Sequence, residues 1–70
     1  MKRNTMKIED TQIDVESVES ITTQKTHLYY GSIYKLEIVM KSGHIHLFNF
    51  GKEDERDLYY NELIQKWINL

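Results

Sequence analysis

The sequence predicts an α+β domain in which an antiparallel sheet of three or four strands packs against one C-terminal amphipathic helix. Three observations support this class. Residues 13–16 alternate apolar and acidic side chains, as a half-buried strand does. Two strand-like runs, 33–41 and 44–50, flank a short turn. Apolar residues then recur at helical spacing over about residues 53–69, after a cluster of carboxylates.

The first part of the chain is expected to contain one strand within residues 6–21. The spacing of apolar residues changes from two to three near its end, which indicates a bulge or a single helical turn. Residues 22–26 are polar and predict a loop. Gly31-Ser32 is either a hairpin turn or a bulge in a longer strand. Residues 1–5 are polar and expected to be disordered, which leaves 6–70 as a single domain.

The second hairpin is expected to turn through a two-residue loop, Ser42-Gly43. This loop would pair Met40 with Ile45 and Val39 with His46. The face expected to form the core carries Leu36, Ile38, Met40, Ile45 and Leu47. The opposite face is unusually apolar for a solvated surface and carries Val39, His46, Phe48 and Phe50.

The C-terminal segment predicts a helix that opens with Glu53, Asp54, Glu55 and Asp57. Four carboxylates there are interpreted as compensation of the helix dipole rather than as a metal or acid–base site. The apolar stripe of the helix consists of Tyr59, Tyr60, Leu63, Ile64, Trp67, Ile68 and Leu70. We expect Leu63 and Trp67 to lie across the core face of the sheet.

Length and composition restrict the function. A chain of 70 residues buries only about 60% of its unfolded surface and often gains stability from a partner. It contains no cysteine, so disulfides and thiolate metal sites are excluded. A net charge of −2 argues against a general nucleic-acid binder. The basic start is not followed by an apolar run, and no stretch is long enough for a membrane span. We therefore expect a cytoplasmic protein.

The order of these elements resembles the C-terminal half of a pleckstrin-homology-like or GRAM-like domain. The resemblance covers residues 12–70 and is carried by Ile13-Asp14-Val15, Ser42-Gly43, Phe48-Asn49-Phe50 and the helix with Leu63 and Trp67. It implies a β-β-β-α architecture and a role in binding rather than catalysis. The lipid-binding part of such domains lies in the half that has no counterpart here, so no binding residue is carried over.

Candidate chemistry is sparse. We find no phosphate-binding glycine loop and no nucleophile motif, so the chain is not expected to be an enzyme. No cofactor is expected. His44 and His46 would lie on the same side of a strand about 7 Å apart and could begin a metal site, with His27 as a third ligand. Two solvent-facing histidines beside a turn explain the same pattern.

The apolar outer face, Val39, His46, Phe48 and Phe50, predicts a protein-interaction surface with Tyr29 and Tyr30 at its rim. A homodimer is its simplest form, because it also supplies missing burial. Two other readings stay open: the segment around Ile8 covers this face, or the faces are inverted and the phenylalanines are core. The alternative function is a nucleic-acid-binding accessory protein, using Tyr29, Tyr30 and Tyr34 with Lys25, Lys35 and Lys41.

Overall fold

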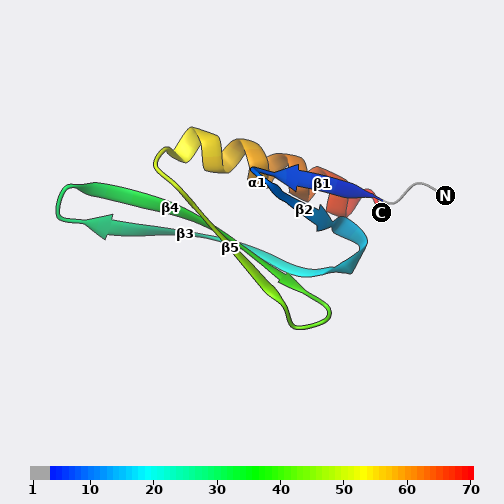
Figure 1. Cartoon of the computed structure of the whole chain (residues 1–70). Helices are drawn as coiled ribbons and strands as arrows, with labels where there is room; N and C mark the ends of the chain where they lie inside the picture. The colour runs from blue at the N-terminus through cyan, green and yellow to red at the C-terminus, as the bar shows by residue number, and fades with distance from the viewer. Residues whose placement is uncertain (1–3) are drawn as a thin grey trace.

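The computed structural model describes residues 4–70 and confirms the α+β class (Figure 1). The elements, in chain order, are β1 (Thr5–Ile8), β2 (Thr11–Asp14), the short 3-10 turn η1 (Val15–Ser17), β3 (Val18–Leu28), β4 (Gly31–Met40), β5 (Ile45–Phe50) and α1 (Glu53–Ile68). Strands β3, β4 and β5 form an antiparallel sheet in chain order, and β1 and β2 form a separate hairpin.

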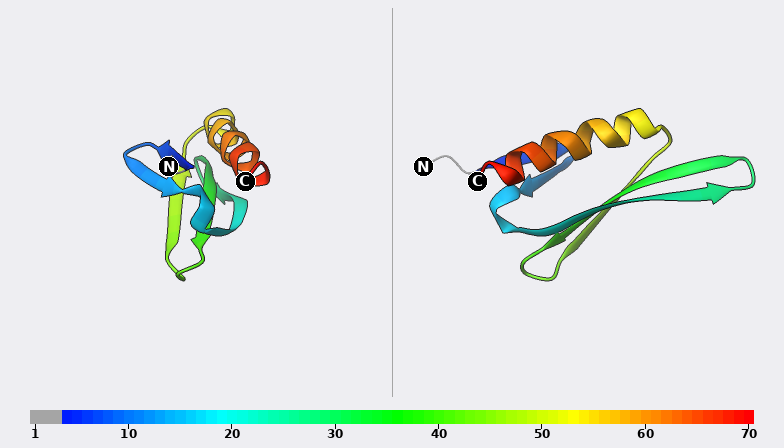
Figure 2. Two further views of the ribbon diagram at one scale, coloured as in Figure 1. Left: turned by 90° about the vertical axis from the view of Figure 1, so that its right-hand side faces the viewer. Right: turned by 180° about the vertical axis from the view of Figure 1, so that it is seen from behind.

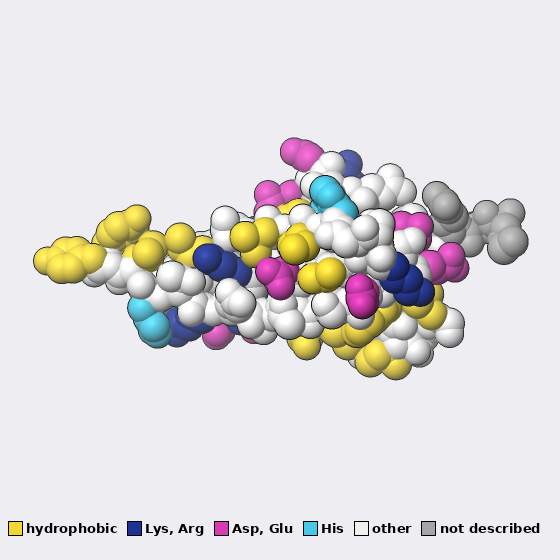
Figure 3. All heavy atoms as spheres, turned by 90° about the horizontal axis from the view of Figure 1, so that it is seen from below, with side chains coloured by type: hydrophobic (Ala, Val, Ile, Leu, Met, Phe, Trp, Pro, Cys, Tyr) yellow, Lys and Arg dark blue, Asp and Glu magenta, His cyan; other side chains and the backbone are white. Residues whose placement is uncertain are grey.

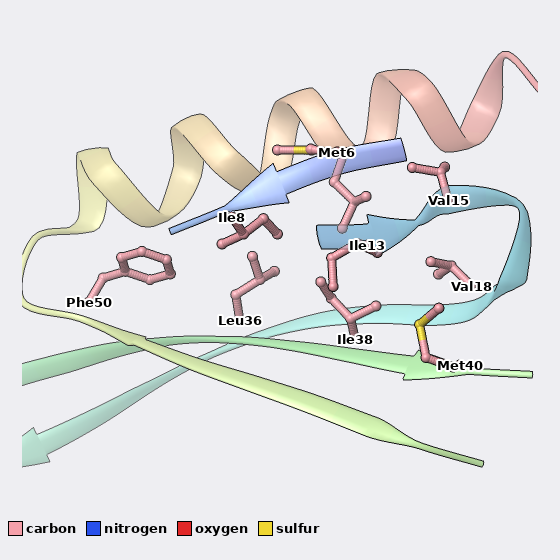
Figure 4. Close-up of a cluster of buried hydrophobic side chains, with 10 residues drawn as sticks. Met6, Ile8, Ile13, Val15, Val18, Leu36, Ile38, Met40 and Phe50 are labelled. Atoms are coloured by element: carbon pink, nitrogen blue, oxygen red, sulfur yellow. The ribbon is translucent and has the colours of Figure 1, made fainter. Parts of the chain in front are cut away.

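Two layers make up the body of the domain. Helix α1 and the β1–β2 hairpin lie side by side over one face of the three-stranded sheet (Figures 1 and 2). We call that side of the sheet the covered face. Leu36, Ile38 and Met40 of β4 point from it into the core (Figure 4). The other side carries no layer within residues 4–70, and we call it the open face.

The core lies between the sheet and the covering layer. Ile8 and Ile13 of the small hairpin point toward Leu36 and Ile38 of the sheet (Figure 4). Leu63 is the fully buried apolar residue that α1 contributes. The buried set is Met6, Ile8, Ile13, Val15, Val18, Leu36, Ile38, Met40, Phe50 and Leu63. Each large apolar side chain that is fully buried contributes about 1.5–3 kcal/mol.

Polar side chains fix the covering layer at both ends of α1. At its C-terminal end, Trp67 donates through Nε1 to the carbonyl oxygen of Val18 at 3.3 Å. Asn4 donates through Nδ2 to the carbonyl oxygen of Lys66 at 3.2 Å. At its N-terminal end the guanidinium of Arg56 is buried against the sheet. The sequence pattern did not predict a buried arginine.

The distal halves of β3 and β4 form a hairpin arm, residues 25–33, that projects beyond the covering layer (Figure 1). The molecule measures 47 × 23 × 21 Å. Its radius of gyration is 12.6 Å, whereas a compact chain of this length has about 11 Å. The arm therefore exposes more surface than a globular fold of this size requires.

Several expectations for the N-terminal part need correction. Residues 6–21 contain a hairpin as well as a strand, because the chain turns at Glu9, whose φ is +55°. The single helical turn expected afterwards is η1. Residues 22–26 are not a loop but the middle of β3, whose hydrogen bonds to β4 stabilise a polar strand. Asn4 and Thr5 are ordered, and the rest of the expected disordered start, residues 1–3, lies outside the described residues.

The prediction of one C-terminal helix is confirmed. Its start and end agree with the expected 53–69 within one residue. Leu63 is buried, and Tyr59, Tyr60 and Trp67 pack against the core while partly exposed. Ile68 and Leu70 were expected on the apolar stripe but are exposed. Ile68 lies about 140° around the helix axis from the buried Leu63, and Leu70 follows the end of α1.

Candidate interaction surface

The turn between β4 and β5 determines which side chains reach each face. The expected two-residue loop is wrong: the loop has three residues, 41–43. Met40 donates to the carbonyl oxygen of His44 at 2.8 Å, and the amide of Gly43 donates to the carbonyl oxygen of Met40 at 2.9 Å. Gly43 has φ +95°, as expected for the last residue of a three-residue hairpin loop. Val39 therefore pairs with Ile45, one residue away from the predicted register.

A shift of one residue moves every side chain of β5 to the opposite face. Ile45 and Leu47, predicted as core, lie on the open face with exposed fractions of 55% and 53%. Phe50, predicted on the interaction surface, is 4% exposed and stacks on Tyr59 with ring centroids 5.5 Å apart. The inverted-face alternative is thus correct for β5, whereas β4 has its predicted orientation.

The predicted surface residues are therefore split between the two faces. Val39 lies on the open face. His46 and Phe48 lie on the covered face beside Phe50, partly exposed, and their rings stack at 6.3 Å. The segment around Ile8 packs over the covered face, so it does not shield the open one.

The open face has apolar side chains toward both ends and polar ones between them. Ile45 and Leu47 are adjacent outward positions of β5, and Ile45 pairs with Val39. Toward the arm, Leu28 and Ile33 are partly exposed on the same face. Between these groups lie Lys35, Glu37, Thr22, Gln24 and Asn49. Figure 3 shows this side of the molecule, with hydrophobic side chains in its middle and at the end of the arm, and charged side chains among them.

Tyr29 and Tyr30 form the two-residue turn at the tip of the arm. They are fully exposed or nearly so, with values of 105% and 86%. Gly31, beside them, and Val39 are eight residue steps apart along β4, a distance of about 26 Å along a strand. The tyrosines therefore form a separate apolar tip rather than a rim around Val39.

The two histidines of β5 do lie together. The rings of His44 and His46 are 4.5 Å apart between centroids. Burial, and then the neighbouring His44, lower the pKa of His46 below 6.5. His27 lies on the arm, where its Nδ1 is 3.4 Å from the hydroxyl of Ser32. In the part of the chain that the structure describes, no three histidine, cysteine or acidic side chains converge to hold a metal ion.

Sequence reasoning missed Ile45 and Leu47 as surface residues. The signal was present in Lys41-Ser42-Gly43, since a glycine at the third loop position is typical of three-residue hairpins. Counting the loop as three residues would have placed both side chains beside Val39.

No family model, curated protein or solved structure matches the chain. Among residues 4–70, no helix is long and apolar enough to cross a membrane. The same residues enclose no pocket. The resemblance to a pleckstrin-homology-like or GRAM-like domain stays a prediction.

Proposed function

We propose that this chain is a small, non-catalytic protein-interaction module that self-associates through its open face. The observation that carries the proposal is the group formed by Val39, Ile45 and Leu47. Two of these aliphatic side chains are more than half exposed and lie side by side on a sheet face that no other element within residues 4–70 covers. Contiguous apolar patches on small domains usually mark an interface.

A second copy of the chain fits the size of the face. Three strands at about 4.8 Å spacing and ten residues at about 3.3 Å give roughly 450 Å² per copy. Two such faces would bury roughly 900 Å², which is less than the roughly 1,200 Å² of stable interfaces and falls in the range of weak, transient complexes. We therefore expect a dimer whose population rises with protein concentration rather than a permanent one.

Two further expectations belong to this proposal. The protein has no catalytic activity of its own, on the sequence argument that it contains no phosphate-binding glycine loop and no nucleophile motif. A cytoplasmic location is also part of the proposal, on the sequence argument given above.

The test is solution mass by light scattering on a size-exclusion column, over a range of concentrations. The wild type is expected to shift from monomer to dimer, and Leu47→Asp is expected to stay monomeric because it places an unpaired charge in the buried contact. Leu58→Asp is the matched control, since Leu58 is 68% exposed on α1. A wild type that is monomeric throughout refutes self-association, and a dimeric Leu47→Asp variant refutes this face.

A second candidate function is single-stranded nucleic-acid binding by the sheet. It is favoured by an uneven charge distribution: residues 20–52 contain four lysines and one glutamate, a formal charge of +3 in a chain of −2. The three tyrosines do not form one surface for base stacking, however. Tyr34 is partly buried, and Lys25 and Arg56 lie over its ring at 5.4 and 5.6 Å from the ring centroid. Fluorescence titration with short oligonucleotides tests it. Absence of binding at about 50 μM protein in low salt excludes it.

A further inference from the structure

We infer that two copies pack open face to open face with their β4 strands antiparallel. The two-fold axis that relates the copies lies between the two faces and crosses β4 at the level of Leu36. This inference rests on the proposed self-association and adds its geometry. It is carried by the order of the outward side chains along β4, which are Ile33, Lys35, Glu37 and Val39.

The order is apolar, cationic, anionic, apolar, and it is self-complementary when one copy is reversed. An axis across the strand at Leu36 brings Lys35 of each copy to Glu37 of the other. The same operation brings Ile33 of each copy to Val39 of the other. A two-fold interface requires this reciprocity, because each contact occurs twice.

The charges favour this orientation over its alternative. If the strands ran parallel, Lys35 would face Lys35 and Glu37 would face Glu37, and like charges across an interface are strongly unfavourable. Lys35 and Glu37 lie only about 3.3 Å on either side of the axis, so their pairing is retained at the inclination of about 30° between packed sheets.

The structure leaves both charged groups available for such a pairing. Both side chains are partly exposed on the open face. Within residues 4–70, Lys35 forms no ion pair. The carboxylate of Glu37 accepts a hydrogen bond from the Thr22 hydroxyl at 3.3 Å, which orients it on the same face. A second copy would supply the opposite charge that Lys35 lacks.

Charge exchange tests the pairing. Lys35→Glu and Glu37→Lys are each expected to raise the dimer Kd about tenfold or more, because each replaces two attractive contacts with repulsive ones. The double variant, which exchanges the two charges, restores the Kd to within about threefold of wild type. Lys25→Glu changes the same charge on the covered face and should leave the Kd within about threefold. Sedimentation equilibrium at low salt measures these values.

Crosslinking tests the orientation, since the chain has no native cysteine. A bis-maleimide with a reach of about 10 Å matches the spacing of packed sheets. An equimolar mixture of Ile33→Cys and Val39→Cys should yield the mixed dimer. Neither variant alone should crosslink, because residues 33 of the two copies would be about 20 Å apart.

The outcomes separate this inference from the proposed function. A dimer that crosslinks Ile33→Cys to itself, or that is insensitive to both charge reversals, overturns the antiparallel arrangement while self-association stands. A monomeric wild type overturns both. Circular dichroism melts of each variant at a concentration where wild type is monomeric identify any that fail to fold, and Lys35→Gln and Glu37→Gln then take their place with a smaller rise in Kd.

Discussion

Arg56 donates a hydrogen bond through Nη1 to the carbonyl oxygen of Gln24, 32 residues earlier in the chain, at 3.1 Å. The same nitrogen lies 3.4 Å from the carbonyl oxygen of Lys35. Asp57 accepts from Nε at 2.7 Å, and the ring of Tyr34 lies beneath the guanidinium. One buried side chain therefore connects the start of α1 to both strands at the base of the arm.

Replacing Arg56 should lower the stability of the fold. Arg56→Ala is expected to lower the free energy of unfolding by about 3 kcal/mol, because backbone carbonyls lose a charged donor and the packing over Tyr34 is lost. Lys52→Ala, at an exposed cation four residues earlier, should change it by no more than about 0.5 kcal/mol. Urea unfolding followed by circular dichroism measures both. Equal effects of the two substitutions would contradict the role of Arg56.

The two phenylalanines of β5 should differ in their contribution to stability. Phe50 is 4% exposed and stacked on Tyr59, so Phe50→Ala is expected to cost about 3–5 kcal/mol. Phe48 is only partly buried, and Phe48→Ala should cost less than about half of that. The same urea titrations compare them. If Phe48→Ala were the more damaging substitution, the register of β5 described above would be wrong.

Much of the fold could be predicted from local pattern. The carboxylates at 53–57 and the helical spacing through Trp67 identified α1, and the alternation at Leu36, Ile38 and Met40 identified the inward side of β4. Each of these signals recurs over several residues, so a single exception does not change the predicted element. Arg56 was not predicted because its burial depends on strands far away in the sequence.

The interaction surface could not be predicted as reliably as the helix and the inward side of β4. Whether Ile45 or His46 faces outward depends on a single loop residue, since the side-chain period of a strand is two. Both sets of β5 side chains, Ile45 and Leu47 or Phe48 and Phe50, are apolar enough for a core. The backbone conformation of Gly43 decides between them, and it became visible only in the structure.

That conformation leads to a prediction about two glycines. At Gly43, φ is +95°, so Gly43→Ala should lower the free energy of unfolding by about 1–2 kcal/mol through backbone strain. Gly51 has no positive φ, and a Cβ there would meet nothing within 4 Å. Gly51→Ala should therefore be neutral or stabilise by up to about 1 kcal/mol. Thermal melts monitor both variants. Equal losses would show that the hairpin loop does not require the glycine.

The histidine pair predicts a dependence of stability on pH. Burial first, and then the charge on His44, lower the pKa of His46 in the folded chain below 6.5. Between the two pKa values the unfolded chain holds more protons, so stability rises with pH in that window. The contribution is fully present above pH 6.5 and is lost as the pH falls through the folded pKa. His46→Gln should therefore lose less stability than wild type between about pH 7.5 and pH 5.5.

An NMR titration of the ring protons measures this effect directly. In the wild type, His46 should titrate with a midpoint below 6.5. In His44→Gln the midpoint should rise but stay below that value, because the charge of His44 is removed while the larger cause, burial, remains. A His46 midpoint at or above 6.5 in the wild type would mean that its ring is fully solvated. The stacking of His46 on Phe48 would then not persist in solution.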